Sequence, residues 1–222
     1  MSLSGDDARQ AIRSTRKRLK DLGSEAARRL KPGHKIGGAK LAHTFPELSV
    51  PDDLYALWQE TDGVDLEGDP ALDALWLDGM NAFLSEEEAI DDYVMASRLQ
   101  ADEPEFGQYW PRGFVPVASP GEGSRLLVNC VKGSPTHGAL YMLDHGVGLS
   151  RMTISLGQYF ETILDWVDTN SLRINRDGVV ELNLDASMKV AHTMNPGCDA
   201  WDGAMPPAHE TRDWVGRREG NS

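Results

Sequence analysis

The stretch FVPVASPGEGSRLLVNCVKGSPTHGALYML, residues 114–143, decides the fold class. It contains three short runs rich in branched and aromatic residues: Phe114 to Ala118, Arg125 to Val131 and Ala139 to Leu143. Gly, Pro and Ser separate the runs, which is typical of strands joined by turns. Because the connections are too short for a helical crossover, we expect neighbouring strands to pair antiparallel.

Two helices are predicted on the N-terminal side of these strands. One is expected to begin at Pro51, in VPDDLYALWQETDGVDL, and to end at Gly63. The other begins after Ser85, which has capping-box spacing to Glu88. The run ALWLDGMNAFL, residues 74–84, lies between them and predicts a strand and a turn.

One strand and one helix are predicted on the C-terminal side. The strand is expected from Ser150 to Ile154, and Ser155 is placed to cap a helix whose apolar face runs from Leu156 to Val167. The order of elements indicates an α+β fold class, a single domain with a mainly antiparallel sheet of about five or six strands packed against helices.

The two ends of the chain differ from this central part. Residues 6–30 predict one helix, with Ile12 and Leu19 on its apolar face and Arg and Lys opposite. It either packs on the domain or serves a nucleic acid or membrane surface, and its lack of interleaved aromatics favours packing. At the other end, LRINRDGVVELNL predicts a hairpin, and the chain beyond Met194 an irregular extension with Trp201 and Trp214. We therefore divide the chain into 1–32, a basic N-terminal helix; 33–170, the α+β domain; and 171–222, the hairpin and extension.

The charge is unevenly distributed along the chain. Up to Pro46 there are 11 Lys and Arg against 4 acidic residues, a net charge of +7. The remainder holds 11 basic and 31 acidic residues, a net charge of −20, which together give the total of −13. An acidic body is suited to a basic protein partner and repels nucleic acid, although acidity can also serve solubility alone.

The sequence also bears on compartment and redox state. No run approaches the roughly 18 apolar residues that span a bilayer, and the N-terminus does not have the order of a signal peptide, so we expect a cytoplasmic protein without membrane contact. Cys130 and Cys198 lie in unrelated contexts, which predicts no structural disulfide.

Templates for phosphate and metal sites fit the sequence poorly. The loop Pro120-Gly121-Glu122-Gly123-Ser124 carries a glutamate where a phosphate loop needs lysine, and it leads into a strand. Acidic residues crowd the stretch from Asp62 to Asp69, but not in the order of a calcium loop. The histidines are too scattered for zinc. We therefore expect no cofactor and no metal.

Templates for covalent catalysis also lack required residues. No serine stands in a G-x-S-x-G elbow, and Cys130 lies in a strand-like run that predicts a buried, inert thiol. Asp144 and His145 are adjacent, so on a strand they point to opposite faces and are better explained as a hairpin corner. These observations favour a binding module over an enzyme.

Five segments, taken in order, resemble the SUKH superfamily, which includes yeast killer-toxin-resistance and cell-wall-assembly regulators and many bacterial toxin-immunity proteins. They are LKPGHK, VPDDLYALWQETDGV, YWPRGFVPVASPGEGSRLLVNC, HGALYMLDHGVG and SLGQYFETILDWV, spread over residues 30–169. The chain departs from the family pattern at Asn129, where Asp is common, and at Gly157, where Phe is common. The resemblance implies a non-catalytic scaffold, and in bacteria a cytoplasmic antidote that binds and neutralises a toxin domain, often a nuclease.

Three functional hypotheses follow. The first is an immunity protein with a basic toxin domain as its protein partner, and we nominate as contacts Trp76, Trp110, Arg112, Glu122, Asp144 and His145. The alternative for the two tryptophans is that they fill the core, as large aromatics more often do, and for the four polar residues that they only finish turns. The second is a regulatory scaffold that uses the basic helix and the Trp-bearing tail. The third is an enzyme that uses Asp144, His145 or the acidic stretch near Asp62.

Overall fold

A five-stranded antiparallel sheet lies at the centre of the computed structural model, which describes residues 5–103, 110–121, 123–144 and 148–201. Its strand order is β3-β4-β5-β6-β7, so each strand pairs with its neighbour in the chain. The strands are β3 Ala82–Phe83, β4 Phe114–Ser119, β5 Arg125–Asn129, β6 Leu140–Asp144 and β7 Gly148–Thr153. The predicted meander and its antiparallel pairing are confirmed.

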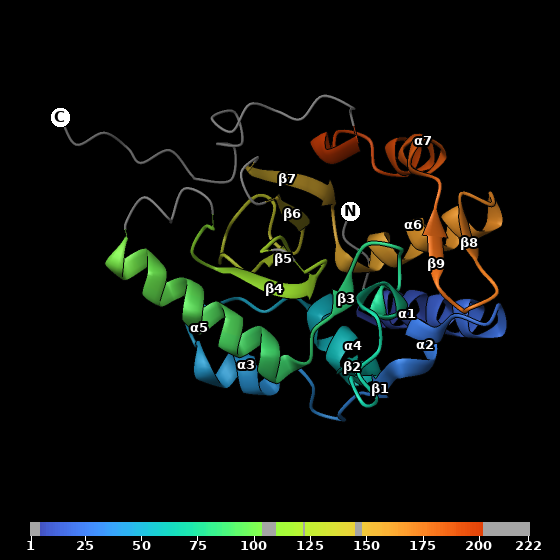
Figure 1. Ribbon diagram of the computed structural model, residues 1–222. Helices are drawn as coiled ribbons and strands as arrows, with labels where there is room; N and C mark the ends of the chain where they lie inside the picture. The colour runs from blue at the N-terminus through green and yellow to red at the C-terminus, as the bar shows by residue number, and fades with distance from the viewer. Residues whose placement is uncertain (1–4, 104–109, 122, 145–147, 202–222) are drawn as a thin grey trace.

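Helices cover the sheet on two sides. They are α1 Gly5–Asp21, α2 Glu25–Arg29, α3 Ala39–Thr44, α4 Asp52–Glu60, α5 Glu86–Asp102, α6 Leu156–Asp168 and α7 Leu184–Met194. Figure 1 shows α5 and α3 to one side of the sheet and α1, α2 and α6 to the other. The structure is thus a single compact α+β domain of mixed helices and antiparallel sheet, as the sequence predicts.

The predicted helix caps are present. The Ser85 side chain accepts a hydrogen bond from the Glu88 amide at 3.2 Å, while the Glu88 carboxylate accepts from the Ser85 amide at 2.7 Å. Ser155 begins α6 by accepting from the Gln158 amide at 3.2 Å. These short-range bonds satisfy backbone donors that the first turn of a helix leaves without partners.

The N-terminal segment is not the single predicted helix. The chain breaks at Gly23, whose φ of 97° lies in the left-handed region. Ser24 then caps α2, and Leu30–Pro32 forms a strand, β1, that pairs antiparallel with β2, Thr61–Val64. The pattern of apolar residues continues through the break, which is why the sequence predicted one helix.

Three predictions around α4 and β3 were also wrong in detail. Gly63 does not end α4, because the helix ends at Glu60 and Gly63 lies within β2. Pro51 is the N-cap of α4 rather than its first helical residue. The run at residues 74–84 forms strand only at the two residues of β3, and its first two residues belong to a 3-10 helix, η1 Leu72–Leu75.

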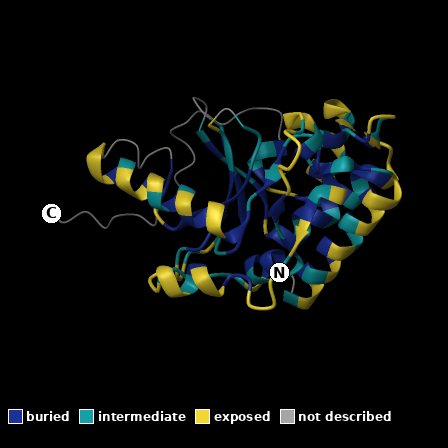
Figure 2. Cartoon of the chain, turned by 60° about the horizontal axis from the view of Figure 1, so that its bottom comes forward, coloured by how far each residue is buried: buried dark blue, intermediate teal, exposed yellow. Residues whose placement is uncertain are grey.

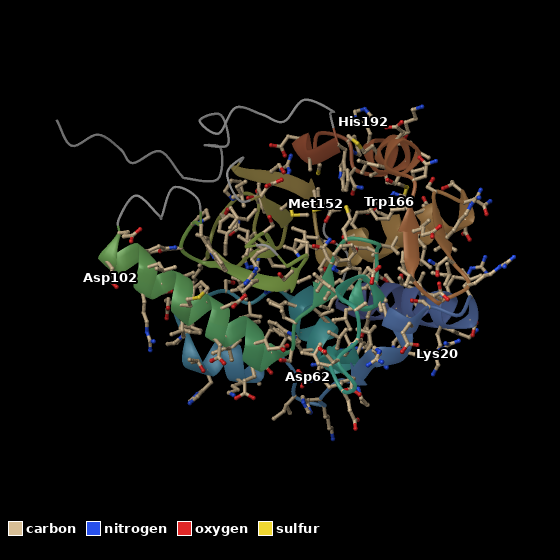
Figure 3. All side chains as sticks on the ribbon, in the orientation of Figure 1. Lys20, Asp62, Asp102, Met152, Trp166 and His192 are labelled. Atoms are coloured by element: carbon tan, nitrogen blue, oxygen red, sulfur yellow. The ribbon has the colours of Figure 1, made fainter. Side chains whose placement is uncertain are left out.

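The C-terminal segment is more regular than the sequence indicated. The predicted hairpin is confirmed as β8 Leu172–Ile174 and β9 Val180–Leu182. Helix α7, which the sequence analysis missed, follows Asn183, and a short 3-10 helix, η3 Asp199–Trp201, ends the described chain. Trp166 of α6 lies beneath α7 (Figure 3) and donates its indole N–H to the Ser187 carbonyl at 2.9 Å. Trp214 lies outside the described residues.

One hydrophobic core joins the three predicted segments. It extends from Ala8 in α1 through the sheet and α6 to Trp201 in η3. Figure 2 shows the strands mostly buried and the exposed residues as stripes along the outer sides of the helices. The described residues of 1–32 and 171–222 are therefore integral to the domain. Burying apolar surface is the main favourable term that holds such layers together.

Candidate protein-interaction surface

The sheet has two ends, and the nominated contact residues are divided between them. At the end that we call the hairpin end, Arg125 pairs with Leu143 and Asp144 pairs with Gly148. Asp144 therefore lies beside the turn between β4 and β5. Glu122 and His145, which were also nominated, lie outside the described part of the chain.

Trp110 and Arg112 lie at the opposite end, where Phe114 pairs with Asn129. Trp110 is only 3% exposed and packs in a second apolar cluster with Phe114. Its indole N–H donates to the Phe114 carbonyl at 2.9 Å. Trp110 is thus a core residue and not a contact, which corrects its nomination. Arg112 is exposed, but the sheet separates it from Asp144.

Trp76 belongs to the hairpin end. It follows η1 in a segment that enters the sheet at Ala82, the partner of Ser119 in β4. The side chain is half-buried, and its Nε1 atom is buried without a hydrogen-bond partner among the described residues. Trp76 therefore lies close to the surface and is not fully part of the core.

Asp78 anchors the segment that carries Trp76, and the sequence analysis missed it. The side chain is fully buried and accepts from the amides of Met80 at 2.8 Å and Asn81 at 2.6 Å. It also accepts from the Asn81 side-chain amide at 2.8 Å and from the Tyr159 hydroxyl. Burial, then the charge of Asp78, raises the pKa of Tyr159, so the phenol stays protonated and donates.

The segment before Trp76, Asp65 to Asp73, is the most exposed acidic stretch of the described chain. We call it the acidic loop. Four of its carboxylates are exposed: Asp65, Glu67, Asp69 and Asp73. It also displays two large apolar side chains, Leu66 with 57% of its surface exposed and Leu72 with 49%. Leu66 and Leu72 are two of the seven large apolar side chains that are exposed among the described residues, and they are the two that lie within an acidic segment.

The acidic loop reaches the hairpin end of the sheet. A Cβ atom added to Gly121, in the turn between β4 and β5, would lie 3.1 Å from Cδ2 of Leu72. Gly121 is therefore a neighbour of the acidic loop. The hairpin end thus brings together the acidic loop, Trp76, Asp144 and the β4–β5 turn.

Arg29 of α2 braces the acidic loop. Its Nη1 donates to the Glu67 carbonyl at 2.9 Å and to the Asp65 carbonyl at 3.3 Å, while the Asp65 amide donates back to the Arg29 carbonyl at 2.8 Å. Glu25 holds the guanidinium through Nε at 2.8 Å. These contacts fix the loop on α2 and leave its side chains directed to solvent. An open groove of about 540 Å³ lies on the same side, between the loop and the α2–β1 segment.

Three arginines of α1 contact α4 and β1. Arg13 Nη2 lies 2.7 Å from the Glu60 carboxylate, and Arg9 donates to Gln59 at 2.5 Å. Arg16 donates to the Glu60 carbonyl at 3.0 Å and to the Leu30 carbonyl at 2.6 Å. Glu60 raises the pKa of Arg13 by hydrogen bonding and by its charge. The predicted basic face therefore holds the C-terminal end of α4, where helix carbonyls and a cation interact favourably.

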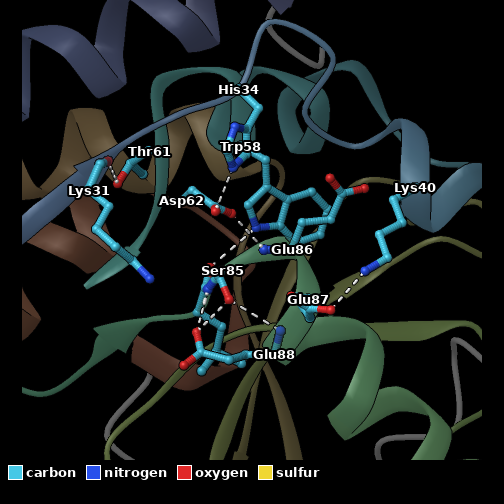
Figure 4. Close-up of polar contacts among 11 residues, drawn as sticks. Lys31, His34, Lys40, Trp58, Thr61, Asp62, Ser85, Glu86, Glu87 and Glu88 are labelled. Carbon is cyan, nitrogen blue, oxygen red and sulfur yellow. Dashed lines mark hydrogen bonds and ion pairs between the residues drawn. The ribbon is translucent and has the colours of Figure 1, made fainter. Parts of the chain in front are cut away.

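A polar junction joins β2, α3 and the start of α5 (Figure 4). The Asp62 carboxylate contacts His34 Nε2 at 2.8 Å and accepts from the Glu86 amide at 3.1 Å. The Glu86 side chain in turn accepts from the Leu41 amide at 2.8 Å. The carboxylate of Asp62 is therefore used for contacts between β2 and its neighbours. Asp62 does not belong to the acidic loop, although the sequence analysis grouped it with the acidic residues up to Asp69.

Asn129 shapes the loop between β5 and β6. Its amide nitrogen donates to Ser134 Oγ and Thr136 Oγ1, both at 2.9 Å, and its oxygen accepts from the Val131 amide at 2.9 Å. A carboxylate lacks the two donors that this position uses. The neighbouring thiol of Cys130 is fully buried, as the sequence predicts, and burial raises its pKa well above its ordinary value.

Two features are absent from the described residues. No group of three or more His, Cys, Asp and Glu side chains in this part of the chain has the arrangement to hold a metal ion. None of the helices in the same part combines the length and the apolar character that crossing a membrane requires.

Comparison with known proteins adds no relationship. Neither a scan against protein-family models nor a search of curated proteins finds a match to the chain.

Proposed function

We propose that the protein is a non-catalytic binding module of the SUKH type, an immunity protein that binds and neutralises a basic toxin domain in the cytoplasm. In the sequence, the proposal is supported by the five segments within residues 30–169 that resemble the SUKH superfamily and follow its order. The structural observation that supports it most is where the charged side chains face. Arginines of α1 face Glu60, while the carboxylates of the acidic loop face solvent beside Leu66 and Leu72.

This arrangement is suited to a basic protein partner. Exposed carboxylates accelerate encounter with a basic domain and disfavour nucleic acid, and exposed leucines supply the apolar contacts that stabilise a complex. The scaffold alternative was based on the basic helix and the Trp-bearing tail. Three of the six cations of α1, Arg9, Arg13 and Arg16, contact α4 or β1, and the other three, Lys17, Arg18 and Lys20, are exposed.

The proposal is tested by growth rescue and co-purification. The toxin-like reading frame beside the gene is expressed with and without this protein. We expect restored growth and a one-to-one complex that survives gel filtration. Growth arrest that persists despite soluble expression of both proteins, with no complex, would refute the immunity function.

A further inference from the structure

We propose that the acidic loop, Asp65 to Asp73, is the docking surface for the basic toxin domain, with Leu66 and Leu72 as its apolar anchors. This inference rests on the proposed function and specifies where the partner binds and by what chemistry.

The apolar part of the argument is the exposure of the two leucines. Leu66 and Leu72 belong to one loop, and each has about half of its surface in solvent. Burying such side chains at an interface is favourable in proportion to the apolar area removed from water. The loop therefore offers two exposed apolar side chains to a partner.

The charges of the loop select the partner. Among the described residues, no ion pair involves Glu67, Asp69 or Asp73. Their carboxylates are exposed and remain available to lysine and arginine side chains of another protein. The occupant to which we commit is thus a basic protein surface with an apolar contact at its centre. A nucleic acid is excluded as the occupant because its phosphates would be repelled.

The loop is also held in place before a partner arrives. Arg29 bonds two of its carbonyls, the Asp65 side chain accepts from the Glu67 amide at 3.0 Å, and Leu72 lies against the β4–β5 turn. A preorganised loop loses little conformational entropy on binding. The groove beside α2 is lined by Arg28, Arg29 and Lys31 as well as by Asp65 and Glu67, so the basic partner is expected to contact the loop on the side away from this groove.

The first experiment removes the apolar anchors. Binding of the catalytically inactivated toxin domain encoded beside the gene is measured by calorimetry. The Leu66→Ala/Leu72→Ala variant is expected to bind on the order of 30-fold more weakly. Leu184→Ala is the matched control, because Leu184 on α7 is 56% exposed, and it should bind like the unmodified protein. Circular dichroism checks that each variant is folded.

The second experiment reverses two charges of the loop. Glu67→Lys/Asp73→Lys is expected to slow association about tenfold at low salt, with a smaller difference at high salt. The control, Asp102→Lys/Asp185→Lys, makes the same change in net charge on α5 and α7, and Asp102 lies at the outer end of α5 (Figure 3). If both pairs of substitutions slow association equally, the attraction depends on net charge and not on the acidic loop. That result would refute the proposal that the acidic loop is the docking surface.

The outcomes separate the two proposals. If the unmodified protein binds the toxin domain and the loop variants bind equally well, the docking surface lies elsewhere and the immunity function stands. If the unmodified protein does not bind the toxin domain, the proposed function fails and this inference fails with it.

Discussion

The acidic loop and the turn that follows it, Trp76 to Asn81, use their carboxylates in opposite ways. In the loop, four carboxylates face solvent and bond little beyond the loop itself. In the turn, the single carboxylate of Asp78 is fully buried and accepts hydrogen bonds from two backbone amides, an asparagine and a tyrosine. A carboxylate with this many donors holds structure together, whereas exposed ones are free to meet a partner.

The largest expected effect comes from removing the buried carboxylate. Asp78→Ala leaves the Tyr159 hydroxyl and the amides of the turn buried without an acceptor, so we expect the free energy of unfolding to fall by about 3 kcal/mol or more. Asp78→Asn keeps one acceptor oxygen and should lose less. Urea unfolding measures both values. A loss below about 1 kcal/mol for Asp78→Ala would show that the turn does not depend on this carboxylate.

The next prediction uses a second buried carboxylate, Asp53 at the start of α4. It is 3% exposed and accepts from the Gly157 amide at 3.0 Å. Burial is the main cause that raises its pKa. Because the pKa of Asp53 is higher in the folded protein than in the unfolded chain, protonation of Asp53 stabilises the folded protein. This contribution is fully present at a pH below the unfolded-state pKa, and it is lost as the pH rises through the folded-state pKa.

Asp53→Asn should therefore change how stability depends on pH. Asparagine does not ionise and keeps an acceptor for the Gly157 amide. The unfolding free energy of the variant, minus that of the unmodified protein, is expected to increase between pH 4 and pH 7. Unfolding curves at both pH values measure this difference. The acidic loop provides the control, because Glu67→Gln makes the same kind of change at an exposed carboxylate and is measured at the same two pH values.

A smaller effect is expected from loosening the acidic loop. Arg29→Ala removes the donors to the Asp65 and Glu67 carbonyls, and we expect a loss of about 1 kcal/mol of stability together with faster amide exchange within the loop. Arg29→Lys keeps the charge but not the fork of donors and should exchange at an intermediate rate. Unchanged exchange in Arg29→Ala would mean that the loop is held by other contacts. It would also weaken the argument that the docking surface is preorganised.

The contrast also shows which features the sequence could predict. The caps at Ser85 and Ser155 and the strands of the meander depend on neighbours in the chain, and they were predicted correctly. The role of Asp78 was missed because its partner Tyr159 lies 81 residues away. The break at Gly23 was missed because the apolar pattern continues across it.

The candidate surface was predicted only in part. The acidic stretch was evident in the sequence, but Asp62 was grouped with it, although the structure uses Asp62 to contact His34 and the start of α5. Trp110 was nominated as a contact because tryptophan is common at interfaces, and burial assigns it to the core. The exposure of Leu66 and Leu72 depends on how α2 and the β4–β5 turn hold the loop, which no local pattern encodes.

The smallest expected effect is on stability when the loop charges are reversed. Glu67→Lys/Asp73→Lys breaks no described ion pair and reduces self-repulsion in a chain of net charge −13, so the free energy of unfolding should change by less than about 0.5 kcal/mol. Thermal unfolding measures this change. A loss above about 1 kcal/mol would mean that these carboxylates stabilise the fold, as Asp78 does. A variant that stays stable but loses toxin binding would show that the two adjacent segments have different roles. The acidic loop would serve recognition, and the turn that contains Asp78 would serve folding.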